Sequence, residues 1–421
     1  MHKRLIFQNM THATWVNLAV ASLLAFYAAQ IALDFAWRTT CGHIAVDYCD
    51  FWSAGQVANT RGYAGMYDLP TLERVERSVF PQGYDPALFI ITPFPYLPVF
   101  VLPFQSLALI PPEVGYIIWS TINIIALIAY LRFFSVRMTG EAPPGRLMIL
   151  LLASLPMFLN VFYGQVEVWL AICAGEFMRQ WAKGSAVRAG LWLGGLLIKP
   201  QLLIVIGLTL LLARAVRALA GLAVSGAVLV GASFLMLGGQ GSLAMARIWQ
   251  AYASGLPSNG VEAMMNWRML GLHVSHLFSP WIGWALVTIG MLTTVLLCLY
   301  VARHPFTPES PSFSIGILGM LAASITVAWH SHVHVALLLL PSLLLLRERN
   351  ILPEGIFEIW VLLPAAFFIA ALLPENLMKL NLVPDQTRQL IYWMRGVGEF
   401  GATLFLLGWS VARSRKQAGT H

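Results

Sequence analysis

Charged side chains are scarce in this chain of 421 residues. Only 11% of the residues are Asp, Glu, Lys or Arg, whereas roughly a quarter of a soluble domain is charged. Hydrophobic residues make up 58%, and the mean hydropathy is +0.72. Apolar stretches long enough to cross about 30 Å of hydrocarbon recur along the whole sequence. This composition excludes a soluble globular protein and predicts an all-α polytopic membrane protein.

Several sequence motifs are also absent. There is no GxSxG motif, no phosphate-binding P-loop and no glycine-rich dinucleotide motif, so nucleotide-driven chemistry is not supported. No internal repeat, low-complexity segment or appended soluble domain is visible, and residues 1–421 are therefore expected to form one membrane domain. The net charge of +7 comes mostly from short loops, where it reports orientation in the membrane and not binding to nucleic acid.

Cysteine is rare as well. Four cysteines are too few for a disulfide scaffold. Cys41 and Cys49 lie in one loop, and a bridge between them requires an oxidising compartment. The sequence leaves open whether they form that bridge or remain free thiols.

The basic residues predict the topology. The apolar run from Trp15 to Trp37 lacks a convincing cleavage site, so it is read as a retained anchor that follows a cytoplasmic N-terminus. The basic C-terminal tail is placed inside by the positive-inside rule. Residues 38–88 and 240–280 then form two large outer loops. The proline-rich segment 88–111 is either re-entrant or an exception to the charge rule, so about 11–13 spans are expected.

Two local patterns lie within this topology. Residues 71–80 predict an amphipathic helix at the membrane interface, with Leu72 and Val75 on its apolar face and Glu76 on its polar face. Lys199-Pro200 interrupts an apolar run, and proline breaks a helix. The run is therefore predicted to form two half-length helices that meet near Lys199 on the outer side.

The expected topology gathers the unusual polar residues on the outer face. Asp47 and Asp50 are either a solvated pair or include a general base, whose pKa would be raised by the aromatic residues around it. Lys199 lies in an apolar run and costs about 2.5–3.5 kcal/mol to insert unpaired, so it is a candidate for binding phosphate. Arg268 is a second candidate cation or an ordinary loop residue. Glu167 is a candidate partner of either cation.

Three alternating histidines occur in a later outer turn. His330, His332 and His334 would share one face of an extended segment. No cysteine or clear carboxylate accompanies them, so binding to substrate, or a plain interfacial position, is favoured over a metal site. No metal and no cofactor are expected.

The order of these motifs resembles glycosyltransferase family 87, the polyprenyl-phosphate-mannose-dependent mannosyltransferases. The resemblance covers about residues 40–345. It rests on Asp47-x-x-x-Phe51-Trp52-x-Ala54-Gly55, Gly62, Tyr67-Asp68, Phe94-x-Tyr96-x-Pro98, Gly164-Gln165, Gly194-x-x-x-x-Lys199-Pro200-Gln201 and a histidine-containing turn before Leu337–Pro341.

The resemblance implies a GT-C fold in a bacterial inner membrane, with an extracytoplasmic active site and a role in the cell envelope. It implies an inverting hexosyltransferase that moves a sugar, mannose in this family, from a polyprenyl-phosphate donor to a glycolipid or glycan acceptor. By the spacing to Ala54, the catalytic aspartate falls on Asp47, with Asp50 second. The expected residues are Lys199, Arg268 and His332 for the donor phosphate, and Tyr96, Gln165, Gln201 and Asn266 for substrate.

Two other functions compete with this interpretation. A GT-C enzyme that uses another lipid-phosphate sugar, pentosyl or glucosyl, would share most of these features. A lipid or sugar transporter would also contain broken helices and a lysine within the membrane. Transporters usually carry inverted repeats and ionisable residues near the midplane, and neither is visible here.

Overall fold

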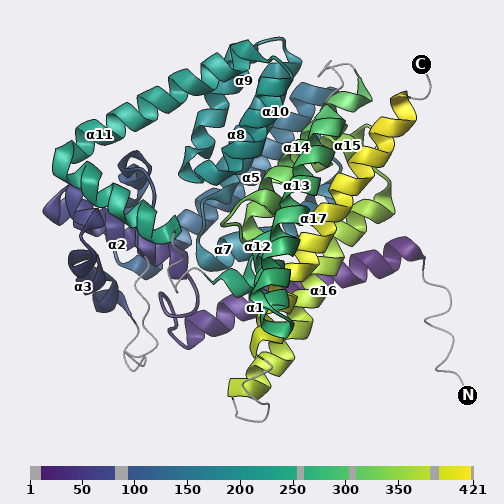
Figure 1. The fold of residues 1–421 in the computed structure, drawn as a ribbon. Helices are drawn as coiled ribbons and strands as arrows, with labels where there is room; N and C mark the ends of the chain where they lie inside the picture. The colour runs from purple at the N-terminus through teal and green to yellow at the C-terminus, as the bar shows by residue number, and fades with distance from the viewer. Residues whose placement is uncertain (1–10, 81–92, 254–259, 303–309, 380–387, 419–421) are drawn as a thin grey trace, which may run out of the picture.

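The computed structural model describes residues 11–80, 93–253, 260–302, 310–379 and 388–418, and within them it forms helices joined by short turns (Figure 1). The α-helices are α1 (His12–Ala36), α2 (Val46–Arg61), α3 (Leu69–Val79), α4 (Leu102–Leu107), α5 (Pro112–Thr139), α6 (Gly145–Leu152), α7 (Leu155–Tyr163), α8 (Glu167–Ala182), α9 (Ala186–Leu193), α10 (Leu203–Leu212), α11 (Val216–Ala253), α12 (Trp267–Leu277), α13 (Pro280–Ala302), α14 (Pro311–Val327), α15 (Leu340–Glu348), α16 (Glu354–Lys379) and α17 (Arg388–Ala418). The 3-10 helices are η1 (Tyr63–Tyr67), η3 (Pro98–Val101), η4 (Gly194–Ile198), η5 (Pro200–Leu202), η7 (Val261–Ala263) and η8 (Val333–Leu339).

The all-helical, polytopic architecture is confirmed. Within the described ranges, five helices are long and apolar enough to cross a membrane, namely α1, α5, α11, α13 and α16, and the pair α6–α7, bent by 55°, makes a sixth if it counts as one span. Other apolar helices have only 10–17 residues. The expected 11–13 spans exceed this number because a sequence does not distinguish one full crossing from two half-length helices joined at a break.

The proline-rich segment is not a full span where it is described. Its apolar helix covers Pro98–Leu107, which at 1.5 Å per residue is about 15 Å and half of the hydrocarbon thickness. The break at Lys199 is confirmed, since Lys199 has non-helical φ −131° and ψ 73° between η4 and η5.

The two expected outer loops are largely helical. Residues 38–88 contain α2, η1 and α3, and α3 confirms the predicted amphipathic helix except that Glu76 is buried instead of facing solvent. The segment 240–280 is not an irregular loop, because α11 continues to Ala253 beyond a kink at Gly238, and α12 fills the later part.

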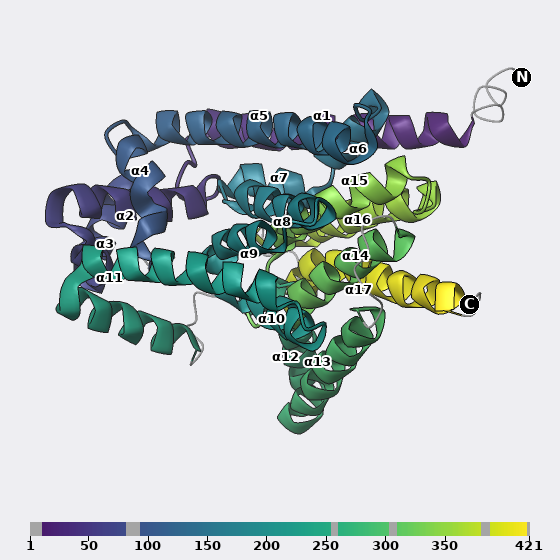
Figure 2. The ribbon, with the colours of Figure 1, turned by 90° about the horizontal axis from the view of Figure 1, so that it is seen from above.

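The centre of the molecule is formed by the segment from α14 to α15. Nearly every residue of α14, η8 and α15 is buried. Figure 2 shows α1 and α5 along one edge, α12 and α13 along the other, and α14 and α17 between them. The turn between α14 and η8 holds His330 and His332, and His334 lies at the start of η8. The histidine segment therefore starts and ends in the core.

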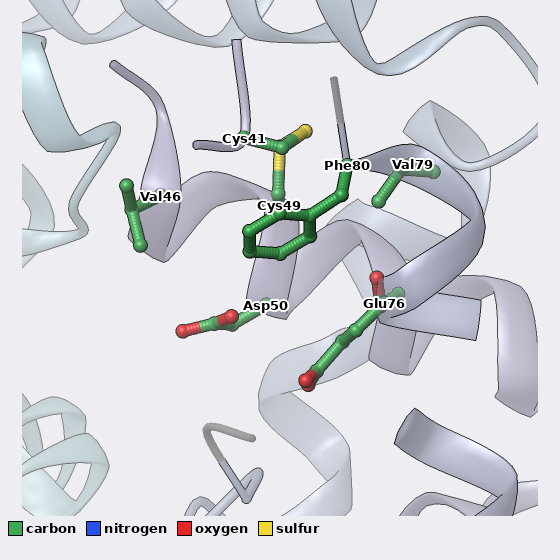
Figure 3. A pocket seen from close by; sticks show the side chains of 8 residues that line it. Cys41, Val46, Cys49, Asp50, Glu76, Val79 and Phe80 are labelled. Atoms are coloured by element: carbon green, nitrogen blue, oxygen red, sulfur yellow. A yellow bond between two sulfur atoms is a disulfide. The ribbon is translucent and has the colours of Figure 1, made fainter. Parts of the chain in front are cut away.

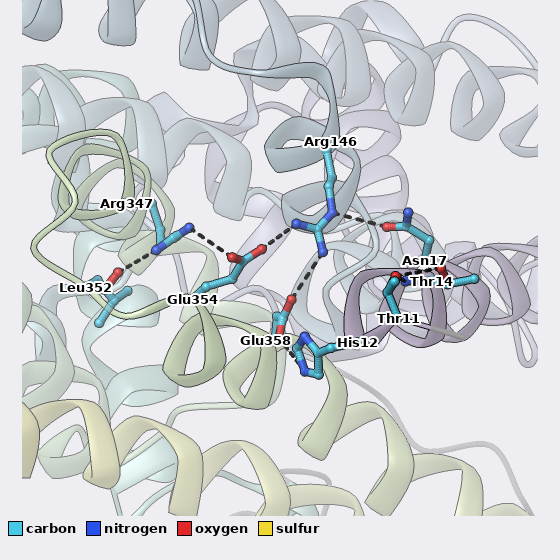
Figure 4. A network of polar contacts seen from close by, with 9 residues as sticks. All are labelled: Thr11, His12, Thr14, Asn17, Arg146, Arg347, Leu352, Glu354 and Glu358. Atoms are coloured by element: carbon cyan, nitrogen blue, oxygen red, sulfur yellow. Dashed lines mark hydrogen bonds and ion pairs between the residues drawn. The ribbon is translucent and has the colours of Figure 1, made fainter. Parts of the chain in front are cut away.

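One polar network joins the helices that carry the basic loops (Figure 4). Arg146, at the start of α6, is paired with Glu354 and Glu358 of α16 and donates to Asn17 of α1 at 3.1 Å. His12 of α1 lies 3.5 Å from Glu358. The network fixes α1 against α6 and α16.

Candidate active site

Asp47 lies in the first turn of α2, and the backbone before it is held in place. Ala45, the residue that precedes the helix, has a left-handed φ of 60°, which is unfavourable for a residue with a Cβ. The Ala45 N–H donates to the Phe162 carbonyl at 2.8 Å. A disulfide joins Cys41 to Cys49 with their Cα atoms 5.5 Å apart, so the bridge that the sequence left open is present.

Gln165 orients the Asp47 carboxylate. Its Nε2 donates to Asp47 Oδ2 at 2.6 Å. Gln165 follows Gly164, which ends α7 with a φ of +73° and lies so close to α2 that an added Cβ would come within 2.4 Å of the Tyr48 Cβ. The Trp119 indole donates to the carbonyls of Gly164 and Gln165 at 3.1 and 3.2 Å. The turn predicted around Gly164-Gln165 is thus present and contacts Asp47 directly.

Lys199 is paired and not free. Its Nζ donates to Glu167 Oε1, and it lies 3.5 Å from His334 Nε2, which is itself 3.5 Å from the same carboxylate oxygen. All three side chains are at most 5% exposed. Burial of a lone ammonium or carboxylate would be very costly, and the pairing removes most of that cost. Of the two cations considered for Glu167, Lys199 is therefore its partner.

These charges act on Asp47. Burial raises the pKa of Asp47 to about 6, against the lowering effects of the Gln165 hydrogen bond and the Lys199 charge, while Glu167 raises it. A carboxyl with a pKa near 6 is mostly ionised at neutral pH and is a stronger base than an exposed aspartate. Both properties suit a general base.

The histidine turn is held by two of the expected substrate-binding residues. Gln201 Nε2 donates to the His330 carbonyl at 2.9 Å. Asn266 Nδ2 donates to the Ala328 carbonyl at 2.9 Å, and its side-chain oxygen caps α12. Gln201 and Asn266 thus fix the backbone of the turn that carries the histidines.

The three imidazoles form a row. The His332 ring centroid lies 4.9 Å from that of His330 and 5.7 Å from that of His334. Burial, followed by the charges of His332, Lys199 and Arg268, lowers the pKa of His330 well below its usual range. His330 is therefore neutral at physiological pH. Among the described residues, no three His, Cys, Asp or Glu side chains are grouped as metal ligands.

Arg268 lies in the first turn of α12 at the other end of this row. Its guanidinium carbon is 4.7 Å from the centroid of the Trp329 ring, which stacks on Trp284 at 6.0 Å. Arg268 Nη1 is buried and has no hydrogen-bond partner in the described part of the chain. A buried donor without a partner is costly, so this atom is well placed to bind an anion.

Asp50 and Tyr96 make contacts different from those of Asp47. Asp50 lines a separate small pocket of about 20 Å³ together with Glu76 and Phe80, beside the disulfide (Figure 3). The Tyr96 ring stacks on Phe51 with centroids 5.1 Å apart. Asp47 and Asp50 therefore have different neighbours, although they are three residues apart on one helix.

Sequence reasoning missed two contributors. Asn160 accepts the Gln165 N–H on its carbonyl at 2.8 Å and the Glu167 N–H on its side chain at 3.1 Å. Asp34, at the end of α1, pairs with His43 at 2.6 Å. The only signal for either one is a polar residue within an apolar run, which gives no indication of its partner.

Comparison with known proteins gives one match. The model of glycosyltransferase family 87 matches residues 94–328, more than half of the chain. No curated protein matches it, and no solved structure does. The matched range includes Gln165, Lys199 and Arg268, whereas Asp47 precedes it.

Proposed function

The chain belongs to glycosyltransferase family 87, and from this premise we propose that it transfers a sugar, mannose, from a polyprenyl-phosphate donor to an acceptor hydroxyl with inversion at the anomeric carbon. The observation that carries the proposal is the partly buried Asp47 carboxylate, held by Gln165 at 2.6 Å with its pKa raised to about 6. A base prepared in this way is what an attacking hydroxyl requires.

In the proposed step the acceptor oxygen forms a bond to the anomeric carbon while the bond from that carbon to the phosphate oxygen breaks. The hydroxyl proton goes to Asp47, and the bonding electrons leave with the polyprenyl phosphate. The base and the departing phosphate lie on opposite faces of the sugar, as inversion requires.

Arg268 is the main proposed ligand of the donor phosphate. Its buried Nη1 has no hydrogen-bond partner among the described residues, and a guanidinium suits phosphate geometry. His332, in the row of imidazoles beside it, is proposed as a second donor. Lys199 contributes charge at longer range, because its ammonium is already paired with Glu167. Cations placed where negative charge develops stabilise a transition state strongly.

The donor and acceptor are proposed to meet at the outer face of a bacterial inner membrane, with both chain ends in the cytoplasm. This orientation follows from the basic loops. The polyprenyl chain of the donor would remain in the bilayer while its phosphate lies at the interface.

The test is the variant pair Asp47→Asn and Asp50→Asn in purified protein. Radiolabelled polyprenyl-phosphate mannose is the donor, with the glucosyl and pentosyl analogues in parallel. We expect Asp47→Asn to lose about 10²–10⁴-fold in transfer rate, the usual contribution of a general base, and Asp50→Asn to lose less than about tenfold. Equal losses in both variants, or undiminished transfer by Asp47→Asn at an unchanged melting temperature, would refute the role of Asp47. Transfer from an analogue but not from the mannosyl donor would refute mannose.

A further inference from the structure

A second cavity lies beside the segment that leads into α2 and Asp47. It has a volume of about 120 Å³, which is far more than a single buried water needs. Its walls come from α1, the segment before α2, α7, α16 and α17. None of its lining residues belongs to the group proposed for the donor phosphate.

Two residues that line the cavity lie only a few positions along the chain from Asp47 or from its partner Gln165. His43 lines it four residues before Asp47, and the N–H of the intervening Ala45 donates a hydrogen bond to the carbonyl of Phe162, which also lines the cavity. Tyr163 lines it two residues before Gln165, the residue that holds Asp47. Any ligand of the cavity would therefore contact the segments that position the base.

Tyr163 separates this cavity from the histidine row. Tyr163 lines the cavity, and its ring makes a T-shaped contact with His334, with the ring centroids 6.4 Å apart. The donor-phosphate residues Arg268 and His332 belong to the row on the His334 side. Tyr163 thus contacts both the cavity and the histidine row.

The lining of the cavity is amphiphilic. Phe158 and Phe368, with ring centroids 6.1 Å apart, form an apolar part together with Leu372. Gln30, His43 and Arg395 form a polar part, and His43 is half-exposed and paired with Asp34. The apolar part belongs to helices that carry bilayer-length apolar stretches, α16 among them.

We propose that this cavity is the acceptor site, and that the acceptor is an amphiphile whose hydroxyl-bearing headgroup lies between His43 and Tyr163 while its apolar chain packs on Phe368 and Leu372. The inference rests on the proposed glycosyl transfer and adds to it a place and a chemical class for the acceptor. A free soluble glycan would leave the apolar part of the cavity unfilled.

The experiment compares two substitutions on α16. Leu372→Trp fills the cavity, whereas Ile369→Trp adds the same bulk at an exposed position three residues earlier on the same helix. The probes are octyl and butyl α-mannoside and β-glucoside, with the methyl glycosides as headgroup-only controls. Equilibrium binding to the purified protein in nanodiscs is measured without donor, and transfer to each probe and to water is measured with donor.

In the wild type we expect binding to tighten about three- to fourfold per added methylene. Leu372→Trp should weaken octyl glycoside binding at least tenfold and raise the acceptor KM in parallel, with donor KM and donor hydrolysis unchanged. Ile369→Trp should match the wild type. Leu372→Ala, which enlarges the cavity, serves as the second variant if Leu372→Trp does not fold, and it should weaken binding of the same probes.

The outcomes separate the two proposals. Binding that responds to Leu372→Trp without any sugar transfer would retain the amphiphile site and overturn the proposed function. Transfer with equal acceptor KM values in the two tryptophan variants would overturn the site and retain the function. Equal binding of methyl and octyl glycosides by the wild type would also overturn the site.

Discussion

The hydrogen bond from Gln165 to Asp47 leads to a quantitative prediction about pH. Gln165→Leu removes a donor 2.6 Å from a carboxylate whose pKa is about 6. Hydrogen bonds to charged groups contribute about 1.5–3 kcal/mol, and about 1.4 kcal/mol corresponds to one pH unit. The substitution should therefore raise the pKa of Asp47 from about 6 to between about 7 and 8.

The direction of the pH effect follows from the ionised form being the base. Activity is present above the pKa of Asp47 and is lost as the pH falls through it. At pH 7 about nine-tenths of wild-type Asp47 is ionised, against between about a tenth and a half in Gln165→Leu. Below pH 6 the variant should therefore lose about 10–100-fold relative to the wild type, whereas above pH 9 the two rates should converge.

The assay is the initial rate of sugar transfer from pH 5 to pH 9.5 at subsaturating donor. Gln201→Leu is the matched control, because the Gln201 amide donates to the His330 carbonyl and not to Asp47, so its acidic limb should stay near that of the wild type. A uniform loss at every pH would show that Gln165 does not set the ionisation of the base. A wild-type profile with no limb near pH 6 would refute the assignment of Asp47 itself.

Three further predictions concern the groups around the base. Glu167→Gln leaves the buried Lys199 ammonium without its carboxylate and should lower the unfolding free energy by about 3–5 kcal/mol. The double variant Glu167→Gln/Lys199→Met should recover much of that loss in thermal unfolding. An equally unstable double variant would contradict this account. Gly164→Ala combines a left-handed φ with a clash and should lower the unfolding free energy by about 2–5 kcal/mol. Gly184→Ala, with a φ of +74° and open space around it, should lower it by only about 1–2 kcal/mol. Equal melting temperatures of the two variants would refute the clash. Arg268→Gln should raise the donor KM about 10-fold or more with partial recovery in Arg268→Lys, and an unchanged donor KM would exclude Arg268 from phosphate binding.

Part of the site could be predicted from the sequence because it depends on local chemistry. Proline cannot continue a helix, so Lys199-Pro200 predicted the break that the structure contains. Gly164 and Gln165 follow an apolar run, and the turn is where the pattern places it. The acidic segment around Asp47 was likewise predicted to lie near Gln165 because both belong to turns on the same side.

The pairings could not be predicted, because they depend on how distant helices pack. Glu167 had two candidate cations in the sequence, and only the packing of α8 against η4 selects Lys199. Asp47 and Asp50 lie three residues apart and read as a pair, yet one faces Gln165 and the other faces α3. The number of full crossings was overestimated for the same reason, since continuity across a break depends on tertiary contacts.

The Arg146 network also has a consequence for the order of assembly during synthesis. The Arg146–Glu354 pair joins positions 208 residues apart, so α1 and α6 leave the ribosome long before the helix that fixes them exists. The proposed acceptor cavity draws its walls from α1, α7, α16 and α17, so it closes only when the last helices are inserted. A chain truncated before α16 would therefore keep Asp47 and its disulfide-bonded segment but would lack two walls of this cavity.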